Sequence, residues 1–392
     1  MVTYPSDWIV KDPYFTLEDS QRVPVTASER PAGTTPYYGA NGVQGFIDGY
    51  THRGEYVLIA EDGANDISDY PVHYVNGTIW VNNHAHAIRG ITGVSDTKYL
   101  SYAFKVFDYS AILVGGTRAK LNGSALRAFT MPLPNLPEQR AIAEVLSGFD
   151  EHLANLDELI TKKKAIRDGA MKALVSGNSR LGGFGDKWTD ISFENMVAPK
   201  ARIGWQNLRT DEYLDSGYSY IIGGTNFSDG TVDLASCKFV SEERFLMDPA
   251  IQVNQGDVLV TKDGTIGKVA VVPQLEKPAT LNSGVYVFRP VDGVTRRFLY
   301  WVLRSDIFDR FIADLSAGST IKHLYQKDLG RFHFRAPKDV PEQEAIAEVM
   351  SSFEEDLLVL KEEREKVERL KLGAMDDLLT GRVRLPLEEE AA

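Results

Sequence analysis

Residues 137–153 of this chain read PEQRAIAEVLSGFDEHL, and 204 positions later residues 341–357 read PEQEAIAEVMSSFEEDL. The match continues without a gap to residues 181 and 385, and 22 of the 45 aligned positions are identical. It includes the triplet Gly-Ala-Met, at 169–171 and again at 373–375. Similarity at a fixed offset indicates an internal repeat, which constrains the architecture more than any single element does.

The repeat extends more weakly toward the N-terminus of each half. GGTRAKLNGSALRAFTMPLP at 115–134 aligns with GSTIKHLYQKDLGRFHFRAP at 318–337, and GEYVLIAEDG at 54–63 resembles GDVLVTKDG at 256–264. We therefore divide the chain into four parts: a globular segment over 1–136, a spacer over 137–181, a second globular segment over 182–340, and a second spacer with an acidic tail over 341–392.

Each spacer is predicted to be one long helix. Pro and Glu open both copies, which suits a first helical turn, and Gly177 and Gly381 stand where a helix would end. Without an internal proline, each helix would be about 60 Å long at about 1.5 Å per residue. Apolar residues recur at alternating spacings of four and three, which is typical of a coiled coil: Ile142, Leu146, Phe149, Leu153, Leu156 and Ile160, then Ala170 and Leu174, and in the second copy Ile346, Met350, Phe353, Leu357 and Leu360, then Val367, Ala374 and Leu378.

Two arrangements of the helices have to be weighed. Each could lie on its own globular segment, but a helix of about 60 Å is longer than a domain of this size can cover. We expect the two stripes to bury each other in an antiparallel coiled coil, because a parallel pair would require a globular segment to run back along the whole helix. The antiparallel arrangement would place the globular segments at opposite ends of the coiled coil, related by a pseudo-two-fold axis. Charged residues interrupt the stripes at Lys163, Arg167, Arg364 and Lys371.

The globular segments are predicted to be rich in β-strands, which makes the fold class α+β. Short β-branched or aromatic runs bounded by Gly, Pro or Asn occur at 54–63 and 77–88 in the first segment, and at 231–240, 256–264, 267–273 and 283–290 in the second. A helix is expected over 295–315, where Phe298, Trp301, Val302 and Phe308 recur at helical spacing.

Composition excludes several classes of protein. The 392 residues are 43% apolar and 25% charged, which is ordinary for a folded soluble chain. Cys237 is the single cysteine, so no intramolecular disulfide can form and a cysteine-based zinc site lacks ligands. The N-terminus does not resemble a signal peptide, and no run of 18 apolar residues is long enough to cross a membrane, so a cytoplasmic protein is expected.

The net charge of −12 argues at first against a nucleic-acid partner. Counted by part, residues 1–136 carry −3, 137–181 carry 0, 182–340 carry −1, and 341–392 carry −8. The globular segments are thus nearly neutral. The second also has a run of basic residues that could hold phosphate oxygens or could equally be solvated surface charge: Lys262, Lys268, Arg296, Arg297, Arg304, Lys322, His323, Lys327, Arg331 and Arg335.

This pattern resembles the specificity subunit of type I restriction–modification systems, over nearly the whole chain. The most specific markers are the paired Pro-Glu-Gln-x-Ala-Ile-Ala-Glu-Val helices with Gly-Ala-Met near their ends. GSTIKHL at 318–324, and YYGANG, LIAEDGAN and WVNNHAHAI at 37–42, 58–65 and 80–88, are also typical of this family and its target-recognition domains.

The resemblance implies that two target-recognition domains each read one half of a bipartite, asymmetric DNA sequence. The long helices would form an antiparallel coiled coil that sets the gap between the halves. Two methyltransferase subunits would dock around them and methylate adenine with S-adenosylmethionine, and motor-nuclease subunits can join to cut unmodified DNA. The specificity subunit itself is expected to be non-catalytic, with no cofactor or metal of its own.

The residues agree with a non-catalytic role. Asp12-Pro13-Tyr14 is one proline short of the loop that adenine methyltransferases place around a flipped base, and residues 264–268 lack the spacing of an ATP-binding loop. His84 and His86 would share one face of a strand, but no further metal ligand is evident. Two alternatives stay open: a single-chain restriction or methylation enzyme, which would need a catalytic motif, and a coiled-coil adaptor without DNA affinity.

Polar and aromatic residues in loops between the strands are the candidates for reading bases, because their donors and acceptors match base edges and phosphates. For Tyr37 and Tyr38, packing in the core is the alternative. The predicted DNA-binding residues are Tyr37, Tyr38, Asn41, Gln44, Asn83 and His84 in the first segment, and Thr225, Asn226, Lys262, Thr265, Ser319, Thr320, Lys322 and His323 in the second.

Overall fold

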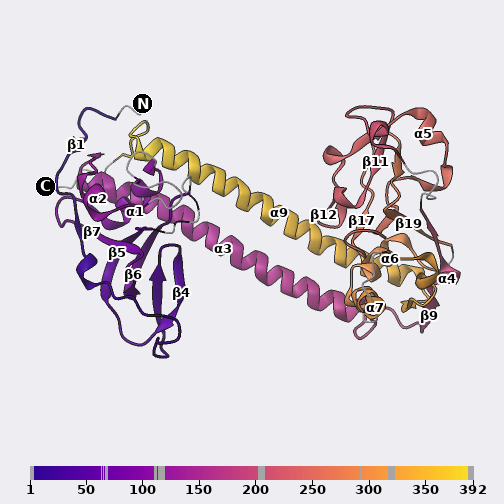
Figure 1. Cartoon of the computed structure of the whole chain (residues 1–392). Coiled ribbons are helices and arrows are strands. Elements are labelled where there is room, and N and C mark those ends of the chain that lie inside the picture. The colour runs from indigo at the N-terminus through magenta and orange to yellow at the C-terminus, as the bar shows by residue number, and fades with distance from the viewer. Residues whose placement is uncertain are drawn as a thin grey trace. The chain divides into compact units, whose positions relative to one another are not determined.

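The computed structural model describes residues 4–62, 64, 66, 69–109, 113, 120–201, 208–291, 293–316 and 323–386. The chain forms two compact units (Figure 1). Unit 1 comprises the chain up to Glu158 together with the part from Glu362 onward, and unit 2 comprises Leu159–Lys361. Among the described residues, no helix combines the length and apolar character needed to cross a membrane.

Both spacers are single long helices, as predicted. Helix α3 spans Leu136–Leu174 and α9 spans Val340–Leu379, so each ends two or three residues before the glycine expected to follow it. In each unit a segment of α3 lies beside a segment of α9 (Figure 1).

Ion pairs between the two helices fix their direction. In unit 1, Asp150 pairs with Lys371 and Asp157 with Arg364, so residue numbers rise along α3 as they fall along α9. Unit 2 shows the same order, with Lys163 beside Asp356 and Arg167 beside Glu354. The antiparallel coiled coil is therefore confirmed, and the alternative of two separate helices on their own domains is wrong.

The same pairs explain the charged interruptions of the apolar stripes. Lys163, Arg167, Arg364 and Lys371 each place their cationic group beside an acid of the opposite helix, at N–O distances of 2.8, 3.0, 2.6 and 2.5 Å. Long basic side chains can cover apolar surface with their stems while the charged ends reach outward. The interruptions thus act as charge pairs along the helix seam, which favour one alignment of the helices.

Unit 1 is built on a six-stranded sheet in the order β2-β7-β5-β6-β3-β4. All neighbours are antiparallel except β3 and β6, which run parallel. The strands are β2 (Phe15–Leu17), β3 (Thr35–Gly39), β4 (Gly42–Ile47), β5 (His52–Ala60), β6 (Val72–Val81) and β7 (Ala85–Gly90), and a short pair joins β1 (Ile9–Val10) to β8 (Pro132–Leu133).

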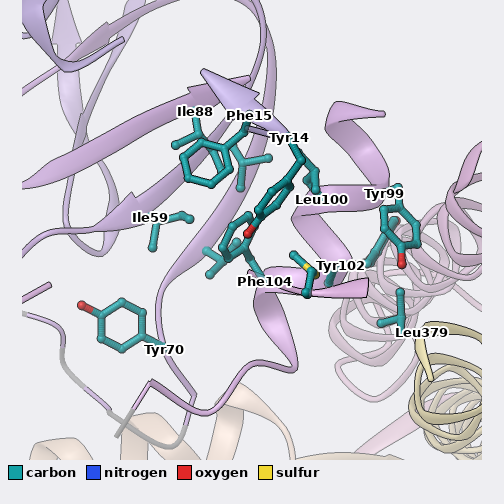
Figure 2. Packing of buried hydrophobic residues seen from close by; sticks show 14 of the residues in the cluster. Tyr14, Phe15, Ile59, Tyr70, Ile88, Tyr99, Leu100, Tyr102, Phe104 and Leu379 are labelled. Carbon is teal, nitrogen blue, oxygen red and sulfur yellow. The ribbon is translucent and has the colours of Figure 1, made fainter. Parts of the chain in front are cut away.

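The main core of unit 1 joins the sheet to the spacer helices through α1 (Thr97–Lys105). Figure 2 shows Leu100 and Phe104 of α1 near Tyr14, Phe15 and Ile88 of the sheet side. The same cluster contains Leu379 of α9, and all these side chains are nearly inaccessible. Burying each such large apolar side chain stabilises the fold by about 1.5–3 kcal/mol, so this core fixes the sheet on the helices.

Unit 2 has a larger set of strands arranged in two main sheets. The six-stranded sheet has the order β10-β19-β16-β17-β13-β12, and the four-stranded sheet has the order β14-β11-β18-β15. The strands are β10 (Val197–Lys200), β11 (Ser219–Ile222), β12 (Phe227–Ser228), β13 (Thr231–Val232), β14 (Lys238–Val240), β15 (Gln252–Val253), β16 (Val258–Thr261), β17 (Val269–Val271), β18 (Ala279–Leu281) and β19 (Val285–Pro290). A separate pair joins β9 (Trp188–Ser192) to β20 (His333–Pro337).

The helix expected over 295–315 is two helices, and that prediction is wrong. α6 (Arg296–Leu303) and α7 (Asp306–Ser316) are separated at Arg304 and Ser305. The Ser305 side chain is buried, and its hydroxyl donates to the carbonyl of Val302 at 2.7 Å and accepts from the amide of Ile307 at 3.3 Å. A serine that bonds to nearby backbone competes with continuous helix and caps the next one.

The two units share one framework. β5, β6, β7 and α1 of unit 1 correspond to β16, β18, β19 and α6 of unit 2, in the same chain order. The parallel pair β3–β6 aligns Tyr38 with Val81, and the parallel pair β11–β18 aligns Ile222 with Leu281. The repeat seen in the sequence is therefore also a repeat of fold.

Candidate nucleic-acid interface

In each unit, hydrogen bonds bring three loops together at the end of the central strand. In unit 1, the amide of Glu61 donates to the carbonyl of His84 at 2.9 Å, and the amide of Leu121 donates to the carbonyl of Glu61 at 2.8 Å. We name residues 61–62, 82–84 and 120 loop cluster 1.

Unit 2 repeats these bonds with different residues. The amide of Lys262 donates to the carbonyl of Gly284 at 2.9 Å, and the amide of Leu324 donates to the carbonyl of Lys262 at 2.8 Å. We name residues 262–267, 282–284 and 323 loop cluster 2. The main chain is thus held in the same way in both units while the side chains differ.

An asparagine shapes the same turn in both clusters. The side-chain oxygen of Asn82 accepts from the amide of His84 at 2.8 Å, and that of Asn282 accepts from the amide of Gly284 at 2.9 Å. The amides of Asn82 and Asn282 donate to the carbonyls of Tyr38 and Ile222. Asparagine suits this position because its side chain bonds to its own backbone two residues on.

Each cluster also presents a histidine held by an aspartate. The His84 Nδ1 lies 2.6 Å from an Asp62 oxygen, and half of its side chain is exposed. In cluster 2, Asp263 occupies the position of Asp62, but its partner is the Nδ1 of His323, which comes from a different loop. Because the aspartate takes Nδ1, Nε2 is the ring nitrogen left to meet a ligand.

A charge network lies beneath cluster 1. Ligand-type atoms of Asp19, Glu61 and His86 lie within 4.8 Å of one another, a spacing that could suit a metal ion. Two cations already balance the acids, however, with the Nη1 of Arg22 2.6 Å and the Nζ of Lys120 2.9 Å from Glu61 oxygens. Burial alone would raise the pKa of Glu61, but hydrogen bonds from Lys120 and Arg22 outweigh it and lower the pKa below its usual value. We interpret the group as an ion-pair network.

The two predicted tyrosines are part of the framework. Tyr37 is 2% exposed, its hydroxyl accepts from the amide of Val25 at 2.9 Å, and the Arg30 guanidinium covers its ring at 3.8 Å. Tyr38 is half-buried against a small hydrophobic core, and this burial raises the pKa of its hydroxyl. Both tyrosines therefore pack within the fold, which is the alternative to base reading that the sequence left open for them.

The other predicted residues of unit 1 are exposed. Asn83 and His84 belong to cluster 1, and Asn41 lies in the turn between β3 and β4. The side chain of Gln44 on β4 is linked to the cluster because its Oε1 accepts from the Nδ2 of Asn82 at 3.5 Å. The β3–β4 hairpin therefore adds one amide side chain, that of Gln44, to cluster 1.

In unit 2, the predicted residues fall into two groups. Thr225 and Thr265 are exposed, and the ammonium of Lys262 lies 5.3 Å from the centre of the Tyr286 ring, where burial lowers its pKa. Asn226 has a structural task, because its Oδ1 accepts from the amide of Gly223 at 2.8 Å and its Nδ2 donates to Ser236 at 3.0 Å. Ser319, Thr320 and Lys322 lie outside the described residues.

Several of the basic residues between 296 and 335 are engaged within the protein. Arg296 lies 3.2 Å from an oxygen of Asp257, Arg297 reaches Glu344 and Glu348, and Arg304 lies 3.2 Å from Glu354. Arg297 on α6 and Arg304 directly after it thus join this part of the unit to α9. Part of the basic run therefore serves to attach the unit to its helix.

The sequence did not predict the role of the repeated Gln in Pro-Glu-Gln. Gln139 is buried, its Oε1 accepts from the amide of Asp96 at 2.9 Å, and its Nε2 donates to the carbonyls of Val94 and Pro134 at 3.1 and 2.9 Å. Gln343 makes the same contacts with Thr295, Gly293 and Pro337. Asp96 and Thr295 cap α1 and α6, so each glutamine ties a recognition unit to its spacer helix.

Residues 15–165 and 207–369 match the family model described as "Type I restriction modification DNA specificity domain". Two copies of one framework, each with its own long helix, are a DNA-target-recognition architecture. The chain belongs to the type I restriction–modification specificity subunit family.

Relatives and solved structures agree with this assignment. A putative type I restriction enzyme specificity subunit of Haemophilus influenzae is 25% identical over 89% of this chain and 87% of its own length. The MjaVIII specificity subunit of Methanocaldococcus jannaschii is 23% identical over 74% and 71%. The crystal structure of the S subunit from M. genitalium matches 96% of this chain and 98% of its own with a TM-score of 0.65 at 19% identity, so it shares the fold.

Proposed function

We propose that this chain reads a bipartite, asymmetric DNA target without performing chemistry itself. In this proposal, loop cluster 1 reads one half of the target and loop cluster 2 reads the other. The observation that carries the proposal is the pairing of identical framework bonds with different side chains. His84 corresponds to Gly284, Lys120 to His323, and Glu61 to Lys262. Two similar scaffolds with unlike surfaces suit two unlike base sequences.

The residues proposed to contact DNA are the predicted ones whose side chains are not assigned to the framework. Asn and Gln side chains can bond to both edge atoms of adenine, and a histidine or lysine can reach guanine or phosphate. We assign Tyr37, Tyr38 and Asn226 to the framework that positions these side chains. The contacting residues are proposed to be Asn41, Gln44, Asn83 and His84 in unit 1, and Thr225, Lys262, Thr265 and His323, with Ser319, Thr320 and Lys322, in unit 2.

We further propose that the coiled coil sets the gap between half-sites and that two methyltransferase subunits dock on the chain, one for each repeat. Motor-nuclease subunits would join the same complex, which would act in the cytoplasm. The charge distribution supports the proposal that partner subunits supply part of the contacts with DNA phosphates, because the units are close to neutral and residues 341–392 carry −8.

The experiment is DNA binding by the chain purified with its methyltransferase partner. We expect binding that depends on sequence and falls steeply with salt, because phosphate contacts release counterions. Binding insensitive to both sequence and salt would favour the adaptor alternative. Methylation of DNA by the isolated chain with S-adenosylmethionine would favour the single-chain enzyme.

A further inference from the structure

We propose that unit 1 has a phosphate-binding pocket formed by Arg53, Arg89 and Arg140, which takes a backbone phosphate of the DNA that cluster 1 reads. This inference rests on the proposed function and adds a contact that carries affinity rather than sequence information. The pocket has a volume of about 460 Å³ and is open to solvent. It is lined by the start of β5, the end of β7, the loop before α1 and the first turn of α3.

Arg89 is held in a fixed position within this pocket. Its Nε donates to the carbonyl of Glu55 at 3.2 Å, its Nη2 donates to the carbonyl of Arg53 at 3.1 Å, and its guanidinium lies 4.4 Å from the centre of the Tyr56 ring. Gly54 makes room for it, because a Cβ at that residue would lie 2.9 Å from Nη2. A guanidinium held in this way loses little entropy when it binds a phosphate.

Arg53 and Arg140 add two charges without acidic partners. Both side chains are exposed, and within the described part of the chain neither forms an ion pair. Of the two acids in the pocket, Asp96 already accepts from the amide of Tyr99 at 2.8 Å at the start of α1. The other, Glu55, bonds to the Tyr74 hydroxyl and helps raise the pKa of that group to about 12, after burial as the larger cause. Three arginines and two carboxylates therefore line the pocket, which leaves a formal charge of +1 to attract an anion.

In unit 2, the position that corresponds to Arg89 has an acidic partner within the protein itself. Arg289 corresponds to Arg89, and Asp257 stands where unit 1 has Tyr56, one residue before the paired stretch of the central strand. Asp257 is fully buried, with its oxygens 3.0 Å from Arg289 and 3.2 Å from Arg296. Unit 1 has an aromatic ring in place of this carboxylate, so within the described part of the chain Arg89 lacks the acidic partner that Arg289 has.

The position of the pocket favours a phosphate of the DNA that cluster 1 reads. Ala60 pairs with Ala85 beside cluster 1, whereas Glu55 and Gly90 in the pocket lie five residues further along the same two strands. At about 3.3 Å per residue this is roughly 17 Å, which is about half a helical turn of DNA. Arginine forks match phosphate oxygens, and such contacts position a protein without reading bases.

The test compares the Arg53→Ala/Arg140→Ala double variant with the unchanged chain, each in complex with the methyltransferase partner. We expect roughly three- to tenfold weaker DNA binding for target and non-target sequences alike, and a log-log salt slope smaller by about 1. The matched control is Arg297→Ala, an exposed arginine on α6, which should leave the slope unchanged.

Two results would overturn this inference. An unchanged affinity and slope in a folded double variant would show that the pocket contacts no phosphate. Weakened assembly with the methyltransferase at an unchanged slope would show that the pocket binds a carboxylate of the partner instead. If the unchanged chain itself showed no sequence-dependent binding, the proposed function would fail, so the two failures can be told apart.

Discussion

Arg180 donates to both carboxylate oxygens of Glu342, from Nε at 2.9 Å and from Nη2 at 2.5 Å. Glu342 is fully buried in the first turn of α9, whereas Arg180 follows the end of α3. Unit 1 contains the reciprocal pair, in which Arg384 after α9 binds Glu138 at the start of α3. In each pair the arginine comes from one repeat and the glutamate from the other. The end of each helix therefore lies beside the start of the other helix, which requires the two helices to be antiparallel.

The buried glutamines should be more important for stability than their polar character suggests. Gln343→Leu keeps a similar volume but leaves the amide of Thr295 and the carbonyls of Gly293 and Pro337 without a partner. We expect the free energy of unfolding to fall by about 2–4 kcal/mol. Urea unfolding measures it, with the exposed Gln21→Leu as control. A loss below about 0.5 kcal/mol, the range of ordinary surface changes, would contradict this role.

The pair of Asp150 and Lys371 should favour the observed register of the helices. Either charge reversal alone, Asp150→Lys or Lys371→Asp, replaces the attraction across this 2.5 Å contact with repulsion between like charges. Each single variant should lower the unfolding free energy by roughly 1 kcal/mol, and the double reversal should recover part of that loss. Additive losses in the double-mutant cycle would show that the pair contributes nothing.

Asp150 should also make the stability of unit 1 sensitive to acid. Burial raises the pKa of this carboxyl, but hydrogen bonds from Lys371 and Tyr102 lower it more, so its pKa lies below the ordinary value of 3.8. The stabilisation is therefore present above pH 3.8 and disappears as the pH falls through the lowered pKa. Asp150→Asn should be less stable than the unchanged chain at pH 6, and the difference should shrink toward pH 2. A constant difference would contradict the assignment.

The two histidines should affect separate halves of the target. His84→Ala should relax base preference at one half-site by about 1–3 kcal/mol per contacted base pair, and His323→Ala should do so only at the other. Binding to a library of randomised half-sites measures the effect. Loss of preference in both halves from one substitution would mean that the histidine acts through the fold rather than through contact.

The spacer should act as a ruler. One heptad inserted in α3 between Asp157 and Lys163, together with one in α9 between Asp356 and Arg364, keeps the flanking ion pairs intact. Each helix would lengthen by about 10.5 Å, or about three base pairs, and the preferred gap should grow accordingly. An unchanged gap would show that the helices do not set it.

The coiled coil was predictable because its signal lies in the spacing of residues along one helix, and the second copy repeats it. The structural roles of Tyr37 and Asn226 could not be predicted, because the sequence does not show whether a polar side chain bonds to DNA or to the protein's own backbone. Gln139 was missed for the same reason. Its partners Asp96 and Val94 lie more than 40 positions away in the sequence, and its third partner, Pro134, lies just before its helix. The break at Ser305 depended on a local hydroxyl bond that helical periodicity does not report.

The central claim is that the two loop clusters read two unlike half-sites at a fixed distance. Sequencing of methylated bases in the host, with and without this gene, tests it most directly. We predict that one asymmetric motif, made of two defined halves separated by a gap of constant length, is methylated only when the gene is present. Methylation that is identical with and without the gene, or a lost motif consisting of one uninterrupted sequence, would contradict the claim.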